Sequence, residues 1–250
     1  MQVLIVAICG LLLGHALYLV YPRFYSDQRL GGPLEGCPRC HAALRPVYML
    51  PLLGYALTLG RCRDCGERLP LRALVLPLGG AALFATSYFV FDGVTGGLLG
   101  GFFATVFLTL TLTDIERRLL PNRIVYPSVL IAVATSWAWP DSSAVEVLAG
   151  GLVALAIAGS LLIISLPFGE GAFGMGDVKM IVLIGFVVGL PSVLVGIVLG
   201  TVVAAVVALL LIALRFKTRK DYIPHGPFLA LGAVIALFWG AQLWDGYRGN

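Results

Sequence analysis

The sequence predicts an all-α polytopic membrane protein with about eight transmembrane helices. Of its 250 residues, 59% are hydrophobic and only 12% are charged, which is far more apolar than a soluble domain. The apolar residues gather in long runs that short polar segments separate. Because lipid offers no hydrogen bonds to the backbone, such runs are expected to form helices, which satisfy their own peptide groups.

Eight apolar runs are the predicted spans. They cover about residues 1–20, 71–91, 96–113, 123–139, 145–167, 178–190, 191–214 and 228–243. The first run has no basic residue before it and no small-residue cleavage site, so we expect an uncleaved span and not a signal peptide. The sixth run is short and is expected to pack inside the bundle. Tryptophans at the far ends of the fourth and eighth runs are expected to anchor the membrane interface.

Basic residues lie almost entirely on one side of this predicted bundle. Eight spans place segments 22–70, 114–123, 168–179 and 215–225 on the same side. Counting Arg72 at its edge, that side holds every one of the 17 lysines and arginines except Arg248. The positive-inside rule makes this side cytoplasmic, so a multi-pass cell (inner) membrane protein is expected. The basic loop at residues 215–220 is expected to contact anionic lipid headgroups of the bilayer. It is not expected to bind nucleic acid.

Four of the five cysteines form two C-x-x-C pairs in the one sizeable polar segment, residues 22–70. Cys37 and Cys40 form the first pair, and Cys62 and Cys65 form the second. Two such pairs can direct four thiolates at one metal in tetrahedral geometry, which is typical of structural zinc. The alternatives are disulfides or free thiols, and a reducing cytosol favours zinc.

Two aspartates stand at membrane boundaries on different predicted spans. Asp114 closes the third run, and Asp177 precedes the sixth within Gly174-Met-Gly176-Asp177-Val-Lys179. Charge so close to lipid is costly and indicates a functional site. The two glycines leave room for backbone or substrate beside Asp177. The pair therefore indicates an aspartic-protease dyad, whereas the alternative is a pair of carboxylates lying among headgroups.

The two aspartates are expected to titrate as a unit that shares one proton. Asp177 begins a helix, where the helix dipole favours its anion, and Asp114 ends one, where the dipole disfavours it. On this argument Asp177 carries the charge and Asp114 the proton. Glu116 and Glu170 are expected to be boundary residues, and Lys179 is expected to hold loop geometry or pair with a carboxylate.

At these residues the chain resembles the type IV prepilin peptidase family of membrane aspartic proteases. The 174–179 segment resembles the family's GxGDxK motif, and Asp114 followed by Pro121-Asn122 resembles its first aspartate segment. Ile223-Pro-His-Gly226-Pro resembles its IPFGP stretch, with His225 in place of phenylalanine. The cysteine pairs, with Leu50-Pro51-Leu-Leu-Gly between them, resemble the amino-terminal domain of the long, bifunctional members.

The resemblance implies cleavage of a prepilin or pseudopilin leader peptide on the cytoplasmic side, after a glycine that precedes the pilin's hydrophobic segment. Long members also methylate the new amine with S-adenosylmethionine. Here Tyr18 stands where asparagine is usual, and Pro77 where glutamate is usual. Because proline can neither accept a proton nor donate from its backbone, we expect methyl transfer to be absent or slow.

The expected organisation has three parts: a first span at residues 1–21, a cytoplasmic zinc-binding segment at 22–70 and a seven-span aspartic peptidase domain at 71–250. Two other classes remain open. Intramembrane charge also marks scaffolds and transporters, although these aspartates lie at the boundary and not the midplane. A protease with the Gly-x-Gly-Asp motif could also cut within the bilayer, and the position of the cut separates it from a leader peptidase.

Overall fold

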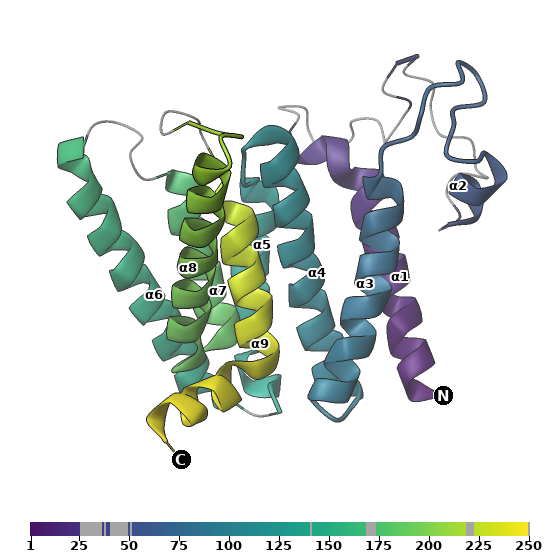
Figure 1. The fold of residues 1–250 in the computed structure, drawn as a ribbon. Coiled ribbons are helices and arrows are strands. Elements are labelled where there is room, and N and C mark those ends of the chain that lie inside the picture. The colour runs from purple at the N-terminus through teal and green to yellow at the C-terminus, as the bar shows by residue number, and fades with distance from the viewer. Residues whose placement is uncertain are drawn as a thin grey trace. The chain divides into compact units, whose positions relative to one another are not determined.

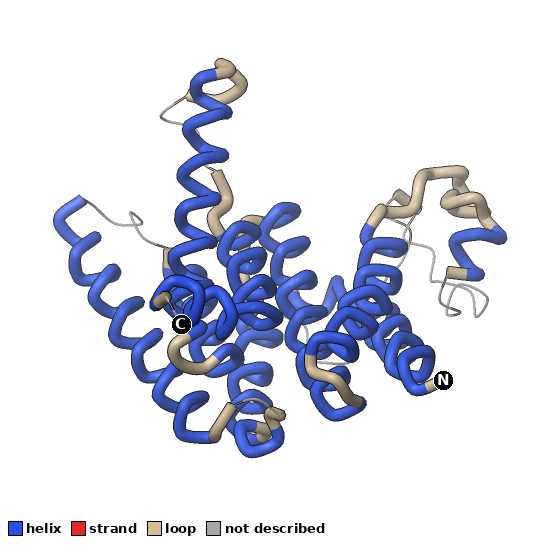
Figure 2. Tube along the Cα trace, turned by 60° about the horizontal axis from the view of Figure 1, so that its bottom comes forward, coloured by secondary structure: helices blue, strands red, loops and turns tan. Residues whose placement is uncertain are grey.

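The computed structural model describes residues 1–25, 37, 39–40, 50, 52–140, 142–168, 174–218 and 223–249. Pro51 and Glu170, named above, lie outside these residues. The chain divides into two compact units, Met1–Thr109 and Leu110–Asn250. Throughout the described part, the regular elements are helices joined by loops (Figure 2), which confirms the all-α class.

Six described helices are long and apolar enough to cross a membrane. They are α1 (Gln2–Val20), α3 (Arg72–Val90), α4 (Val94–Arg117), α6 (Ala144–Ser165), α8 (Ser192–Ala213) and α9 (Gly226–Arg248). The predicted fourth and sixth spans form the shorter helices α5 (Asn122–Ala134) and α7 (Met175–Val188). At about 1.5 Å per residue, helices of this length reach only about 20 Å, less than the roughly 30 Å hydrocarbon core.

Short helical turns complete the described elements. They are η1 (Tyr21–Phe24), α2 (Leu53–Leu57), η3 (Ser136–Ala138) and η4 (Leu166–Phe168). The fourth run ends early because the chain leaves α5 after Ala134 and enters η3. Trp137 is exposed there, as an interface anchor should be, but Trp139 is only 7% exposed and packs inside. The prediction that both tryptophans anchor the interface was therefore wrong for Trp139.

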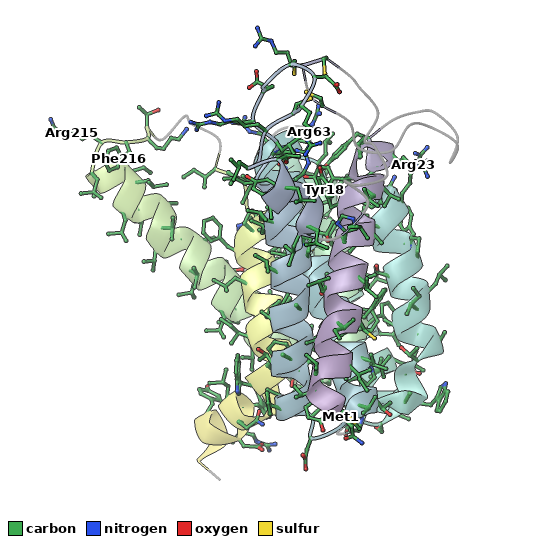
Figure 3. The ribbon with its side chains drawn as sticks, turned by 90° about the vertical axis from the view of Figure 1, so that its right-hand side faces the viewer. Met1, Tyr18, Arg23, Arg63, Arg215 and Phe216 are labelled. Carbon is green, nitrogen blue, oxygen red and sulfur yellow. The ribbon has the colours of Figure 1, made fainter. Side chains whose placement is uncertain are left out.

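In the first unit, α1 and α3 run side by side (Figure 1). Glycines allow the close approach: a β-carbon on Gly80 would lie 3.2 Å from the carbonyl carbon of Gly10, and one on Gly14 would lie 2.9 Å from Cα of Pro77. Small residues at helix contacts are the usual means of tight packing in membranes. Met1 lies at one end of α1, and Tyr18 and Arg23 lie at the other, where Arg63 of the cysteine segment is also found (Figure 3).

In the second unit, α7 is the central element and contacts α5, α6, α8 and α9. Seven of its residues are buried: Met180, Ile181, Leu183, Ile184, Gly185, Val187 and Val188. A β-carbon on Gly150 of α6 would lie 2.6 Å from Cα of Gly189, just past the end of α7. The short sixth run therefore packs inside its bundle, as predicted, with Asp177 in its first turn.

Candidate active site and metal centre

Asp114 lies in the last turn of α4, which continues to Arg117 instead of ending at the aspartate. The residue is only 5% exposed. A buried carboxylate is costly unless hydrogen-bond donors satisfy it. The backbone N–H of Gly226 donates to Asp114 Oδ2 at 3.1 Å. Gly226 is the first residue of α9, so the carboxylate receives a donor from the positive end of a helix dipole.

Asp177 lies in the first turn of α7, just ahead of the apolar stretch that starts at Val178. Burial raises the pKa of its carboxyl to about 6, and the charge of Asp114 acts in the same direction. Two carboxylates that resist joint ionisation can share one proton, which is the arrangement that acid–base hydrolysis by an aspartic dyad requires. Within the second unit, the fold thus brings Asp114 and Asp177 into electrostatic contact although 62 residues separate them in sequence.

Both glycines of the 174–179 segment lie beside the pair. A β-carbon on Gly174 would lie 3.4 Å from Asp177 Oδ2, and one on Gly176 would lie 3.4 Å from Cδ1 of Leu120. These are ordinary van der Waals distances, so among described residues neither position requires glycine for packing. Gly174 caps α7 with extended backbone and is exposed. A side chain at 174 would therefore touch the Asp177 carboxylate, and one at 176 would touch Leu120.

Lys179 joins α7 to α5. Its Nζ donates to Asn122 Oδ1 at 2.8 Å and lies 5.8 Å from the ring centroid of Tyr126. Asn122 is the first residue of α5 and follows Pro121. Of the two roles expected for Lys179, the structure favours holding local geometry, because its described hydrogen bond goes to an amide and not to a carboxylate.

The four predicted cysteines converge in the first unit, with all four sulfurs within 4.8 Å of one another. Cys37 Sγ lies 3.4 Å from Cys65 Sγ, and Cys40 Sγ lies 3.8 Å from Cys62 Sγ. These separations exceed the roughly 2.05 Å of a disulfide. Zn–S bonds of about 2.3 Å in a tetrahedron place sulfurs about 3.8 Å apart. The cluster could therefore hold one metal ion, and its spacing is compatible with zinc.

A tight turn shapes the second cysteine pair. Cys62 N–H donates to the Glu67 carbonyl at 2.7 Å, and Gly66 N–H donates back to the Cys62 carbonyl at 2.8 Å. Gly66 has a φ of +74°, which glycine adopts without steric cost. Arg39 of the first pair's turn lies 3.3 Å from the Glu67 carboxylate, so the two turns are also in contact outside the cluster.

Ionisation within the cluster favours a cation at its centre. Although burial raises the pKa of the Cys37 thiol, backbone N–H groups of Cys40 and Arg39 lower it to about 7. A backbone contact with Glu67 lowers the pKa of Cys65, but the neighbouring Cys37 raises it, to about 12. The negative charge of one thiolate therefore disfavours ionisation of the next thiol. A divalent cation at the centre of the cluster would offset this repulsion.

Sequence reasoning did not single out Gly226 as a site residue. A β-carbon there would lie 2.6 Å from Asp114 Oδ2 and 2.9 Å from its Cγ. The available signal was the stretch from Ile223 to Pro227, which matched a family pattern with no role attached to its glycine. Its role depends on a contact across 112 residues, which local sequence cannot indicate.

Comparisons with known proteins match two parts of the chain to family models. A family model described as "Type IV leader peptidase family" matches residues 101–209, and one described as "Bacterial Peptidase A24 N-terminal domain" matches residues 8–91. No solved structure matches the chain.

Three curated relatives each carry the name prepilin leader peptidase/N-methyltransferase. The protein from Bacillus subtilis is 27% identical over 96% of this chain and 95% of its own length. The protein from Pseudomonas aeruginosa is 28% identical over 84% of this chain and 73% of its own length. The protein from Aeromonas salmonicida is 26% identical over 89% of this chain and 77% of its own length.

Replacing Gly226 by alanine is expected to destabilise the second unit. The added methyl group would overlap the Asp114 carboxylate and disturb the hydrogen bond that satisfies it. Overpacking of this kind costs about 1–3 kcal/mol, which corresponds to a fall of several degrees in the melting temperature measured in detergent. Gly246→Ala is the matched control on the same helix, because no described atom lies within 4 Å of a β-carbon there. Equal melting temperatures for the two variants would contradict the close contact.

Proposed function

We propose that this chain, which belongs to the type IV leader peptidase family, cleaves the leader peptide of type IV prepilins or pseudopilins with Asp114 and Asp177 as its catalytic dyad. The chain is a peptidase by family and a multi-pass membrane protein by its apolar helices. The observation that carries the proposal is the electrostatic contact between two carboxylates, one of them buried, from different helices. The names of the curated relatives supply the substrate class.

In the proposed reaction the scissile carbonyl lies between the two carboxyl groups, and a water molecule attacks its carbon. One carboxylate takes a proton from the water while the protonated partner donates a hydrogen bond to the carbonyl oxygen. The tetrahedral intermediate then collapses, the C–N bond breaks, and the carboxyl group that took the proton gives it to the leaving amine. Burial disfavours the anion at both carboxyl groups, and the Gly226 N–H, which donates to Asp114 Oδ2, offsets part of that cost at Asp114. We therefore assign the proton-accepting role to Asp114 and the shared proton to Asp177, which reverses the distribution expected from the helix dipoles alone.

The surrounding residues have supporting roles in this proposal. Gly174 is exposed and carries no side chain, so the substrate backbone can approach Asp177 there. The hydrogen bond from Lys179 to Asn122 holds the start of α7 against the start of α5. It therefore helps to fix the position of Asp177 along the helix axis. The distribution of basic residues supports a cytoplasmic location for both aspartates and for the cysteine segment.

Asp114→Asn and Asp177→Asn are each expected to abolish cleavage while the protein stays folded and inserted. Asparagine keeps the shape but cannot exchange the shared proton, and loss of one acid–base group costs about 10²–10⁴-fold. Purified protein would be incubated with a prepilin, and the new N-terminus of the product read by mass spectrometry.

Asp245→Asn, at an exposed carboxylate of α9, is the control and should cleave at the wild-type rate. Near-wild-type turnover by either dyad variant at saturating substrate would refute the assignment. The cleavage position in the same spectrum separates a leader peptidase, which cuts before the hydrophobic segment, from a protease that cuts inside it.

We further propose that Cys37, Cys40, Cys62 and Cys65 bind one structural zinc ion. Four thiolates close the coordination shell and leave no position for water or substrate. Purified, unchelated protein should contain about one zinc per chain, and Cys62→Ser should lose most of it and become more sensitive to proteolysis between Cys37 and Cys65.

Cys9→Ser, at the one cysteine outside the cluster, should retain its zinc. Elemental analysis that finds no zinc in the wild-type protein would rule out this site. Cleavage of prepilin should survive removal of the metal, at least in part, because the dyad lies in the other unit.

Methyl transfer is expected to be slow relative to cleavage. Pro77 lies inside α3 and faces Gly14 of α1, and Tyr18 lies one turn further along α1. The two departures from the family pattern thus fall on one helix contact. The cavity that Tyr18 lines with Ala73 and other described residues has a volume of about 20 Å³, which is room for about one water molecule.

Incubation with prepilin and S-adenosylmethionine, read by intact mass, tests this expectation. The product should appear mainly without the added methyl group. The Bacillus subtilis relative, named as an N-methyltransferase, serves as the positive control. A methylated product that forms as fast as the cleaved one would show that neither an acidic residue at position 77 nor an asparagine at 18 is needed.

A further inference from the structure

A pocket of about 270 Å³ lies between α8 and the start of α9 in the second unit. Ala204, Ala205 and Ala208 of α8 line one side, and Ile223, Pro224 and Phe228 line the other. The curated relatives' names and the dyad chemistry say nothing about this pocket. Its position relative to Asp114 is what makes it informative.

The pocket exists because α8 and α9 touch at one end and diverge at the other. A β-carbon on Gly200 would lie 2.9 Å from the Phe228 carbonyl oxygen, and one on Gly232 would lie 2.9 Å from Cα of Gly200. Past this contact α8 continues toward Arg215 and Phe216 and leans away from α9 (Figure 3). The alanines of α8 therefore face a wedge of space that no larger side chain of the described residues fills.

The same short segment forms the pocket wall and the donor to the candidate dyad. Pro224, His225 and Phe228 line the pocket, and Gly226 between them donates its N–H to Asp114 Oδ2. The pocket wall therefore adjoins the residue that donates to the carboxylate. The wall residues that flank Gly226 also cannot move without moving that donor.

The lining chemistry indicates an apolar occupant. Aliphatic and aromatic carbons make up most of the lining. Among the described lining residues, the titratable side chain is that of His225. Burial lowers the pKa of His225, so the imidazole is uncharged at neutral pH. Ligand pockets for whole small molecules span about 300–1,000 Å³. A space of about 270 Å³ suits one or two side chains and is too small for a helix.

Exposed apolar side chains continue from the pocket along α8. Val202, Val206, Leu209 and Leu210 are each about half exposed or more, as expected on a helix face that meets lipid. A substrate whose hydrophobic segment stays in the bilayer can therefore reach the pocket without leaving an apolar environment. Its scissile bond would then lie at the Asp114 end.

We propose that this pocket is a specificity subsite that binds the first apolar side chain on the carboxyl side of the prepilin's scissile bond. The proposal rests on the proposed leader-peptidase function. It assigns Ala205 and Ala208 the role of setting the size of the side chain that fits, and Pro224 and Phe228 the role of the opposite wall. Filling the pocket from the enzyme side should therefore change which substrate is preferred.

The test compares two prepilins that differ only at the first residue after the cleavage site, one with leucine and one with alanine. Ala205→Leu should lower kcat/KM for the leucine substrate by about 10–200-fold, the range for a lost or crowded apolar contact. The alanine substrate should lose much less. Ala208→Leu should act in the same direction. Ala213→Leu makes the same change at an exposed position on the same helix and should leave both rates unchanged.

A second measurement does not depend on the activity of the pocket variants. A prepilin with the photoreactive residue benzoylphenylalanine at that first position would be bound to the cleavage-deficient Asp177→Asn protein and irradiated. Crosslinks should map to residues 201–208 or 223–228. Crosslinks confined to other segments would overturn the subsite.

Failure of the subsite and failure of the function give different results. If the wild-type protein cleaves neither prepilin, the proposed function is wrong. If it cleaves both and Ala205→Leu leaves their ratio unchanged, cleavage stands and the subsite assignment is wrong.

Discussion

The buried carboxylate of Asp114 is the constraint on which the second unit depends. A carboxyl group with only 5% of its residue exposed is costly unless donors satisfy it. The donor here is the first N–H of α9, so the position of a whole helix is coupled to one side chain. That coupling explains why the residue at 226 is glycine: a β-carbon would occupy the space in which the carboxylate lies.

The short helix α7 meets the second requirement of the site, which is to place Asp177 in the field of Asp114. Because α7 packs against α5, α6, α8 and α9, its first turn has a fixed position along the helix axis relative to these helices. Glycines at the contacts with α6 let the backbones approach closely, and Lys179 holds the exposed end through Asn122. A buried, short helix suits this role better than a lipid-facing span, since packing on every side limits its movement along its axis.

The two units divide the chemistry between them. The cysteine cluster brings four sulfurs within 4.8 Å of one another, and the backbone hydrogen bonds of the turn at 62–67 help to position the second pair. The proposed dyad needs an environment that resists double ionisation, and burial of Asp177 within the second unit acts in that direction. In the first unit, the departures at Tyr18 and Pro77 both fall on the packed pair of helices α1 and α3.

The sequence by itself predicted the helical class, the four cysteines whose sulfurs come together and the two aspartates whose charges interact. Each of these depends on local information: the length of apolar runs, the spacing of C-x-x-C pairs, and charge at the edge of an apolar run. It also indicated that residues 178–190 would pack inside the bundle. Tertiary structure alone decided that Trp139 is buried, that Gly226 donates to Asp114, and that a pocket opens beside that donor. These features arise from contacts between residues far apart in sequence, such as 114 with 226 and 200 with 228. The proposed balance of charge between Asp114 and Asp177 depends on one of these contacts, because the helix dipoles could be predicted from the sequence whereas the Gly226 N–H that donates to Asp114 could not.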